Sequence, residues 1–428
     1  MPEGKLKREL GLLEITVYGV GIILGAGIYA LIGQAAGIAG NSLWLSFLIG
    51  AIIASLTGLS YAELGTMFPK AAAEYVYTKK AFNRPLISFL VGWLILVTSL
   101  VSAATVALGF GGYLNGLTGF NVTMGAILLI LGCSFLNFYG MKQSARMNVV
   151  FTLIEVAGLI MILFIGLPYW GSVNYFEMPN GLNGVFTAAM LIFFAYLGFE
   201  DIVNVAEETK KPKQIIPKAI ILSVLISTVL YMAISISAIS VVPWEVLGQS
   251  VAPLADVAST GLPGSGFLLS IIALFATANT VLIILIVNSR MIWGMANDGA
   301  LPKLISKIHP IRATPYIAVI ITMLVCLAFS LNGNIRVVAE ITNMGMFLIF
   351  ISVNAALIYL RYKMPNVKRP FKVPFNIGKL PVLPVLGLLF CVYMLKYVNV
   401  KTLFIGIGVI VLGVIVHVIL KKRNLIKV

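Results

Sequence analysis

Charged residues are scarce in this sequence. Of its 428 residues, 11% are Asp, Glu, Lys or Arg, whereas 60% are hydrophobic. Soluble globular domains carry about 25% charged residues, so the composition excludes a soluble domain. Two long stretches, 86–140 and 257–289, contain no charged residue. The chain is therefore expected to lie in a lipid bilayer.

Residues that bind metals or form cross-links are also rare. The three cysteines, Cys133, Cys326 and Cys391, lie in apolar runs, which predicts buried thiols and no disulfide framework. The two histidines are far apart and belong to no metal-binding motif. The sequence contains neither a phosphate-binding loop of the Walker type nor a pairing of nucleophile and base. We expect no metal, no cofactor and no catalytic residue, and we predict that the protein is not an enzyme.

The sequence is rich in apolar runs of helical length. A helix rises 1.5 Å per residue, so about 20 apolar residues cross the ~30 Å hydrocarbon core of a bilayer. The pattern predicts an all-α polytopic membrane protein with twelve transmembrane helices. Their expected ranges are 14–38, 42–65, 86–114, 122–141, 147–168, 183–206, 217–241, 264–294, 314–332, 337–360, 380–398 and 402–420.

The net charge of +15 is distributed unevenly along the chain. If the spans alternate from an inner N-terminus, the inner segments and span edges hold 27 of the 30 Lys and Arg residues. This asymmetry follows the positive-inside rule and predicts a multi-pass cell-membrane protein with both termini in the cytoplasm. The basic excess is assigned to orientation and to contact with the lipid bilayer, so we expect no nucleic-acid partner.

Two of the expected spans are interrupted near the middle of the membrane. The first contains Gly25-Ala26-Gly27, which weakens the helix, and in the sixth Gly198 is followed by two carboxylates. Close helix packing is the alternative explanation for the glycines. Each interrupted span opens a unit of five, and paired interruptions in two halves point to a transporter site between inverted repeats. The sequence therefore predicts discontinuous helices 1 and 6 in a five-plus-five inverted repeat.

A site made from two helix breaks suits a zwitterion. N–H groups at the start of a half-helix attract a carboxylate, and carbonyls at the end of a half-helix attract an ammonium. An amino acid carries both groups, and main chain alone recognises them. Gly25 and Gly198, together with Ala195 nearby, are expected to contribute to this substrate site.

Three segments carry a further signal. They are "GVGIILGAGIY" in the first span, "FFAYLGFED" running on to "AEETKKPKQIIPKAI", and "SRMIWGMANDGALP" at the end of the eighth. Together they resemble the amino acid–polyamine–organocation permeases, over about residues 8–365. The resemblance implies the five-plus-five fold with two further C-terminal helices. The expected divisions are a cytoplasmic N-terminus (1–13), a transport core (14–362), helices 11 and 12 (363–420) and a cytoplasmic tail (421–428).

The resemblance also implies which main-chain groups bind the substrate. The substrate carboxylate would meet the N–H groups of Ala26 and Gly27. Its ammonium would meet the carbonyls of Ile23, Phe194 and Leu197.

A gate and an acidic residue follow from the same resemblance. Phe194 or Tyr196 would close over the substrate, and Glu200 stands where related permeases often carry an acidic residue. The inner loop 68–85 has Ala72 and Ala73 where the family usually has glycines, so a plain connector is the alternative reading of this loop.

Glu155 is a carboxylate inside an apolar span. An acidic side chain at the bilayer centre costs roughly 2.5–3.5 kcal/mol. Several proton-coupled members of the family carry a lysine at about this place, so the charge is reversed here. Counting from the inner span ends puts Glu155 near the level of Asn288 and Ser289, and we expect these residues, with Glu200, to serve ion coupling. Glu155 is interpreted as a proton carrier, a sodium ligand or a structural hydrogen-bonding group.

The leading functional prediction is a secondary active transporter that takes up amino acids with protons by alternating access. The expected partners are a small amino acid or amine, the proton and the bilayer. An obligate amino acid/amine exchanger is the first alternative, and a sodium-coupled symporter is the second. A passive channel and a sensor built on a transporter scaffold are the alternatives from other classes.

Overall fold

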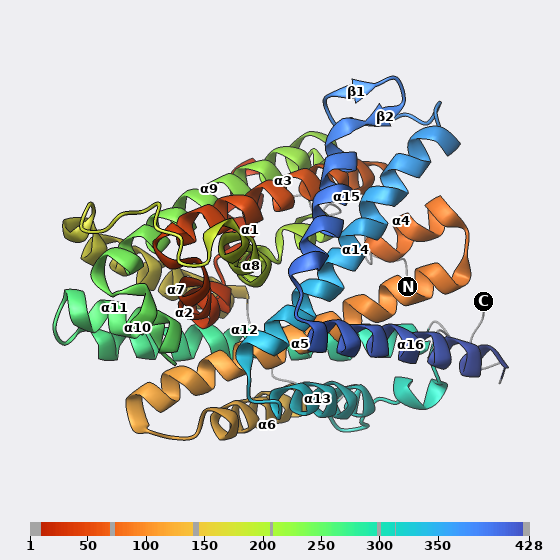
Figure 1. Ribbon diagram of the computed structural model, residues 1–428. Helices are drawn as coiled ribbons and strands as arrows, with labels where there is room; N and C mark the ends of the chain where they lie inside the picture. Colours follow the sequence, from red (N-terminus) through yellow and green to blue (C-terminus); the bar gives the residue numbers. More distant parts are fainter. Residues whose placement is uncertain are drawn as a thin grey trace.

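The computed structural model describes most of the chain, and nearly all of it is helical (Figure 1). Residues 1–9 of the expected N-terminal segment and 423–428 of the expected tail lie outside the described residues. The described ranges are 10–68, 73–139, 145–205, 209–297, 301–312 and 314–422.

Sixteen α-helices and a few short elements make up this structure within the described ranges. The α-helices are α1 (Leu12–Ile23), α2 (Ala26–Ala39), α3 (Leu43–Met67), α4 (Ala73–Phe82), α5 (Pro85–Thr118), α6 (Val122–Tyr139), α7 (Ala145–Gly166), α8 (Gly181–Ile192), α9 (Pro212–Val241), α10 (Trp244–Gln249), α11 (Pro253–Gly261), α12 (Ser265–Asn297), α13 (Tyr316–Ser330), α14 (Ile335–Lys363), α15 (Val382–Met394) and α16 (Val400–Lys422). The short elements are the 3-10 helices η1 (Gly40–Ser42), η2 (Leu167–Tyr169), η3 (Phe193–Tyr196), η4 (Phe199–Val205), η5 (Lys303–Ser306) and η6 (Leu395–Tyr397), and the antiparallel strands β1 (Asn376–Ile377) and β2 (Leu380–Pro381).

The predicted class, an all-α polytopic membrane protein, is confirmed. Among the described residues, nine helical stretches are long and apolar enough to cross a membrane. Three shorter apolar helices are Leu12–Ile23, Tyr316–Ser330 and Val382–Tyr397. Each of the twelve expected ranges overlaps one of these stretches. That all twelve cross a bilayer stays a prediction.

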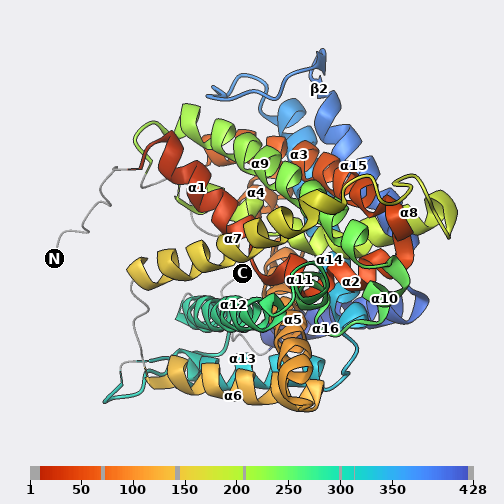
Figure 2. The ribbon, with the colours of Figure 1, turned by 90° about the vertical axis from the view of Figure 1, so that its left-hand side faces the viewer.

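The uncharged helix α5 forms the centre of the bundle. It packs against α6, α12, α13 and α14. α5 also approaches α2 closely through small residues, since a Cβ added at Gly109 of α5 would lie 2.8 Å from the Ala30 Cβ of α2. α6 and α13 lie side by side along one edge of the bundle in both views (Figures 1 and 2). On the opposite side of the molecule, α3 packs against α9.

Three short helices lie at the ends of the bundle. Figure 1 shows α10 and α11 at one end and α4 at the other. Within loop 68–85, residues Ala73–Phe82 form α4, and the interpretation of this loop as a plain connector stays an expectation. Tyr77 and Ala81 of α4, one turn apart, are both fully buried, so this segment is a packed helix with one face against the bundle.

Candidate functional site

The first span is broken where the sequence predicts. α1 ends at Ile23, α2 begins at Ala26, and Gly25 between them has an extended backbone with φ −66° and ψ −163°. The first N–H groups of a helix have no acceptor within it and lie at its positive dipole end. The break therefore presents N–H groups at the start of α2 and carbonyls at the end of α1.

The sixth span is also broken, and over a longer stretch. α8 ends at Ile192, and two 3-10 helices, η3 and η4, follow it. Between them Gly198 has φ +116°, a conformation that side-chain-bearing residues rarely adopt. The Gly198 N–H donates to Oε2 of Glu200 at 2.9 Å, so this buried carboxylate holds the turn of its own chain.

The two breaks pack directly against each other. A Cβ added at Gly27 would lie 2.9 Å from the Ala195 Cα and 3.2 Å from Phe194 Cδ1. Likewise, Gly198 lies against the side chain and main chain of Ile22. A larger residue at Gly27 or Gly198 would push the segments apart, so the glycines allow the two unwound stretches to meet. This contact between spans 1 and 6 is the centre of the candidate site.

Two side chains that the sequence analysis did not single out stabilise the breaks. The hydroxyl of Tyr231, in α9, lies between the carbonyls of Ile23 and Ala195. The side-chain nitrogen of Asn343, in α14, donates to the carbonyls of Met190 and Leu191 at 2.7 and 2.8 Å. Both polar residues are fully buried. Their hydrogen bonds reach carbonyls at the end of α1, near the end of α8 and in η3.

The two expected gate residues differ in their contacts. Phe194 is 5% exposed and its ring edge lies against Gly27 at the first break. Tyr196 is fully buried, and its hydroxyl donates to the Phe47 carbonyl of α3 at 2.9 Å. Phe194 therefore covers the junction directly, whereas Tyr196 ties η3 to α3.

Glu155 lies beside the first break. The side chain of Thr152, one turn earlier in α7, packs against Gly21 of α1. The Tyr29 hydroxyl of α2 donates to the Glu155 carbonyl at 2.7 Å. The Glu155 side chain is only 3% exposed, and its Oε1 has no hydrogen-bond partner in the described part of the chain. A carboxyl oxygen without a partner is costly when ionised and buried.

Asn288 and Ser289 do not lie at the level of Glu155. Asn288 donates to Ser99 of α5 at 2.7 Å, and Ser289 accepts from Asn137 of α6 at 3.1 Å. Within the described residues, no hydrogen bond joins either of them to Glu155.

The contacts of α7 with α12 explain this difference. Phe151 stacks on Phe275, and Gly158 packs against Ile272. Asn288 lies about 13 residues beyond Phe275, or about 20 Å along α12. Counting from the inner span ends failed because α7 and α12 are offset along their axes.

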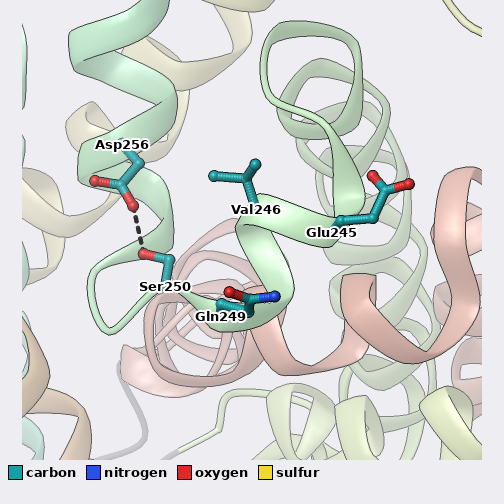
Figure 3. Close-up of a pocket in the computed structure, with 5 residues that line it drawn as sticks. All are labelled: Glu245, Val246, Gln249, Ser250 and Asp256. Carbon is teal, nitrogen blue, oxygen red and sulfur yellow. Dashed lines mark hydrogen bonds between the residues drawn. The ribbon is translucent and has the colours of Figure 1, made fainter.

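Among the described residues, neither a metal-binding cluster nor the surface depression between α10 and α11 coincides with the two breaks. Across the described ranges, no three His, Cys, Asp or Glu side chains are grouped to hold a metal ion. An open depression of about 330 Å³ is lined by residues of α10, the following loop and α11, including Glu245, Gln249 and Asp256 (Figure 3). In it Ser250 donates to Asp256 at 2.5 Å. These side chains are not part of the two breaks.

The family model described as amino acid permease matches residues 10–420. The chain belongs to the amino acid permease family. This permease is 28% identical to the branched-chain amino acid permease BcaP of Bacillus subtilis, over 99% of this chain and 95% of the relative. It is also 28% identical to the methylthioribose transporter of Bacillus subtilis, over 98% and 94% of the two chains. The vacuolar cationic amino acid transporter 4 of Arabidopsis thaliana is 28% identical, over 85% and 64%.

Proposed function

We propose that this permease is a secondary active transporter that takes up amino acids across the cell membrane by alternating access, driven by protons. The observation that carries the proposal is the buried contact between two unwound helices, with Gly27 against Ala195 and Gly198 against Ile22. Paired helix breaks at the centre of a membrane protein are the usual substrate site of transporters built from inverted repeats.

The proposed site binds the two charged groups of an amino acid separately. The carboxylate binds at Gly25, Ala26 and Gly27, where the start of α2 offers N–H groups. The ammonium binds among carbonyls at the end of α1 and in the second break, contributed by Ile23, Phe194 and Leu197. Ala195 and Gly198 complete the site as main-chain neighbours, and Phe194 and Tyr196 act as the gate.

The proposed architecture and orientation follow from the same breaks and from the charge pattern. Spans 1–5 and 6–10 form the inverted repeat within residues 14–362, and spans 11 and 12 follow. Both termini face the cytoplasm, because the basic residues gather on one side of the expected spans. In support, Leu10 pairs with Thr209 after span 6, so these two segments lie at one end of the bundle.

Proton coupling is assigned to Glu155. Its burial, its Oε1 without a partner among the described residues and its place beside the first break support a carboxyl group that gains and loses a proton as the site closes and opens. Obligate exchange and sodium coupling are the alternative modes. Glu200 is the second candidate for protonation, whereas the distance of Asn288 and Ser289 from Glu155 argues for a separate role for these two residues.

The test is an uptake screen with purified protein in liposomes. Two of the three relatives are named for branched-chain or cationic amino acids, so the screen uses the radiolabelled proteinogenic L-amino acids. An inward proton gradient should drive accumulation of at least one of them above its external concentration. If protein-containing liposomes take up no amino acid beyond protein-free ones, with or without preloading, the proposal is wrong.

The same liposomes separate the modes of transport. Uptake that requires amino acid inside the vesicles identifies an exchanger, and accumulation that follows a sodium gradient identifies a sodium symporter. Passive equilibration that no gradient drives beyond the external concentration identifies a channel. Binding without flux identifies a sensor.

A further inference from the structure

Tyr231 joins the two helix breaks through a single atom. Its side chain is fully buried, and its hydroxyl oxygen lies within hydrogen-bond distance of the Ile23 carbonyl in the first break. The same oxygen lies 2.9 Å from the Ala195 carbonyl in the second break. These two carbonyls are separated by more than 170 residues in the sequence, yet one hydroxyl reaches both.

One hydroxyl cannot satisfy both carbonyls at the same time. A tyrosine hydroxyl has one proton to donate, so one carbonyl is left without a donor at any moment. A buried acceptor without a donor costs free energy. An ammonium group has three protons in a compact arrangement, and it would satisfy both carbonyls and still have one proton to donate.

Aromatic neighbours hold the Tyr231 side chain in place. The Tyr231 ring centroid lies 5.3 Å from that of Phe47 and 5.4 Å from that of Tyr196. These rings pack against the Tyr231 ring and so fix the position of its hydroxyl at the junction.

We propose that Tyr231 is a substrate-binding residue for the ammonium group. The ammonium enters among three oxygens, donating to the Ile23 carbonyl, the Ala195 carbonyl and Tyr231 Oη. This inference rests on the proposed function and refines its ammonium site: Ala195 replaces Phe194 as the carbonyl of η3, because the Phe194 carbonyl already accepts the Leu197 N–H at 3.3 Å.

The arrangement also links binding to movement of the two breaks. In this structure the hydroxyl holds the first and second breaks together. An ammonium that enters among the three oxygens takes over these hydrogen bonds, and the hydroxyl changes from a donor to an acceptor. Spans 1 and 6 are then joined through the substrate.

Tyr231→Phe tests the proposal, because it removes the hydroxyl and keeps the ring. Tyr113→Phe is the matched control: Tyr113 is also fully buried, and its hydroxyl donates to the Tyr29 carbonyl at 3.0 Å, within α2 and not to a carbonyl of either break. The probes are the amino acid that wild-type protein takes up best and its desamino analogue, which has the same side chain and carboxylate without the amino group. The readouts are the KM for uptake of the amino acid and the inhibition constant of the analogue.

Losing one charge-assisted hydrogen bond should raise the KM for the amino acid about tenfold or more in Tyr231→Phe. The inhibition constant of the analogue, and the KM of Tyr113→Phe, should change less than about threefold. If Tyr231→Phe raises the KM of the amino acid and the inhibition constant of the analogue by the same factor, the hydroxyl has only a structural role. If the KM stays at the wild-type value, the hydroxyl has no role in binding. Either result overturns the proposal. If wild-type protein transports no amino acid, the proposed function fails first, so the two failures are distinguishable.

A second variant applies if Tyr231→Phe does not fold. Tyr231→Gln keeps one hydrogen-bond acceptor and two donors at the junction. We expect it to weaken binding of the amino acid more than binding of the desamino analogue. If this variant weakens binding of both compounds equally, the proposal is also contradicted.

Discussion

The carboxylate of Glu63, near the end of α3, accepts a hydrogen bond at 2.5 Å from Arg361, near the end of α14. Both side chains are almost fully buried. Arg369 lies 3.1 Å from the other carboxylate oxygen, and the N–H of Val373 donates to Glu63 at 2.8 Å. One buried carboxylate thus faces two guanidinium groups, and it joins α3, α14 and the segment after α14.

Replacing Glu63 should destabilise the protein more than replacing either arginine. Glu63→Ala leaves two guanidinium groups without their anion, whereas Arg361→Ala leaves Glu63 paired with Arg369. Breaking a buried ion pair by removing one partner costs about 3–5 kcal/mol. Unfolding in mixed detergent micelles measures the difference. Glu245→Ala, at an exposed carboxylate of α10, is the control, with a change below about 0.5 kcal/mol. Equal stability of Glu63→Ala and this control would contradict the prediction.

A methyl group at Gly198 should stop transport. The residue has φ +116° and lies against Ile22, so alanine strains the backbone and pushes the two breaks apart. Misplacing a binding group by about 1 Å lowers activity by tenfold or more. Gly132→Ala is the matched control, because a Cβ at Gly132 of α6 meets no atom of the described residues within 4 Å. Initial uptake rates, corrected for the amount of protein in the liposomes, decide the comparison. Wild-type uptake by Gly198→Ala would show that the close contact is dispensable.

The two breaks could be predicted from the sequence because their cause is local. Glycine in the middle of a membrane helix weakens it at that point, and both interruptions lie at the expected glycines, Gly25 and Gly198. Tyr231 could not be found in the same way. It is one of 16 tyrosines, and its contact with Ile23 spans 208 residues of sequence. Such a contact depends on how the helices pack.

The shifts of the helices along their axes could not be predicted from the sequence either. The expected level of Glu155 and Asn288 assumed that spans start at one plane, whereas α7 meets α12 near Phe275. Residue counts give helix lengths, and packing decides how far each helix is shifted along its axis. The same limit applies to α4, whose buried Tyr77 and Ala81 identify it as a helix only once the bundle they contact is in place.

Glu74, in α4 outside the expected spans, should make stability depend on pH. Burial raises its pKa from 4.5 to about 7 and the charge of Asp201 adds to this, whereas the hydrogen bond that Tyr61 donates to its Oε1 at 3.0 Å lowers the pKa. The unfolded chain ionises this group at lower pH than the folded protein does. The contribution of protonated Glu74 to the stability of the fold is therefore complete below the pKa of the unfolded chain, and it is lost as the pH rises toward and past 7.

Glu74→Gln, which mimics the protonated group, tests the predicted direction of this pH dependence. Its thermal midpoint in detergent should equal that of wild type at pH 4 and exceed it at pH 8. Glu245→Gln in exposed α10 serves for comparison and should show no such pH-dependent gain. A Glu74→Gln midpoint that falls below wild type as the pH rises would show that the ionised form is the stable one in the folded protein.

Glu155→Gln should separate exchange from accumulation. The amide cannot carry a proton, yet it has nearly the same shape, and the Tyr29 hydrogen bond to the main chain of residue 155 is unaffected. With one proton per substrate, a gradient of about one pH unit drives about tenfold accumulation. The variant should exchange internal for external amino acid at the wild-type rate but fill liposomes only to the external concentration. Glu200→Gln is the paired control, because Glu200 holds the second break through the Gly198 N–H; damage there should lower exchange and accumulation together. Tenfold accumulation by Glu155→Gln would exclude Glu155 as the proton carrier, and loss of accumulation in Glu200→Gln alone would transfer that role to Glu200.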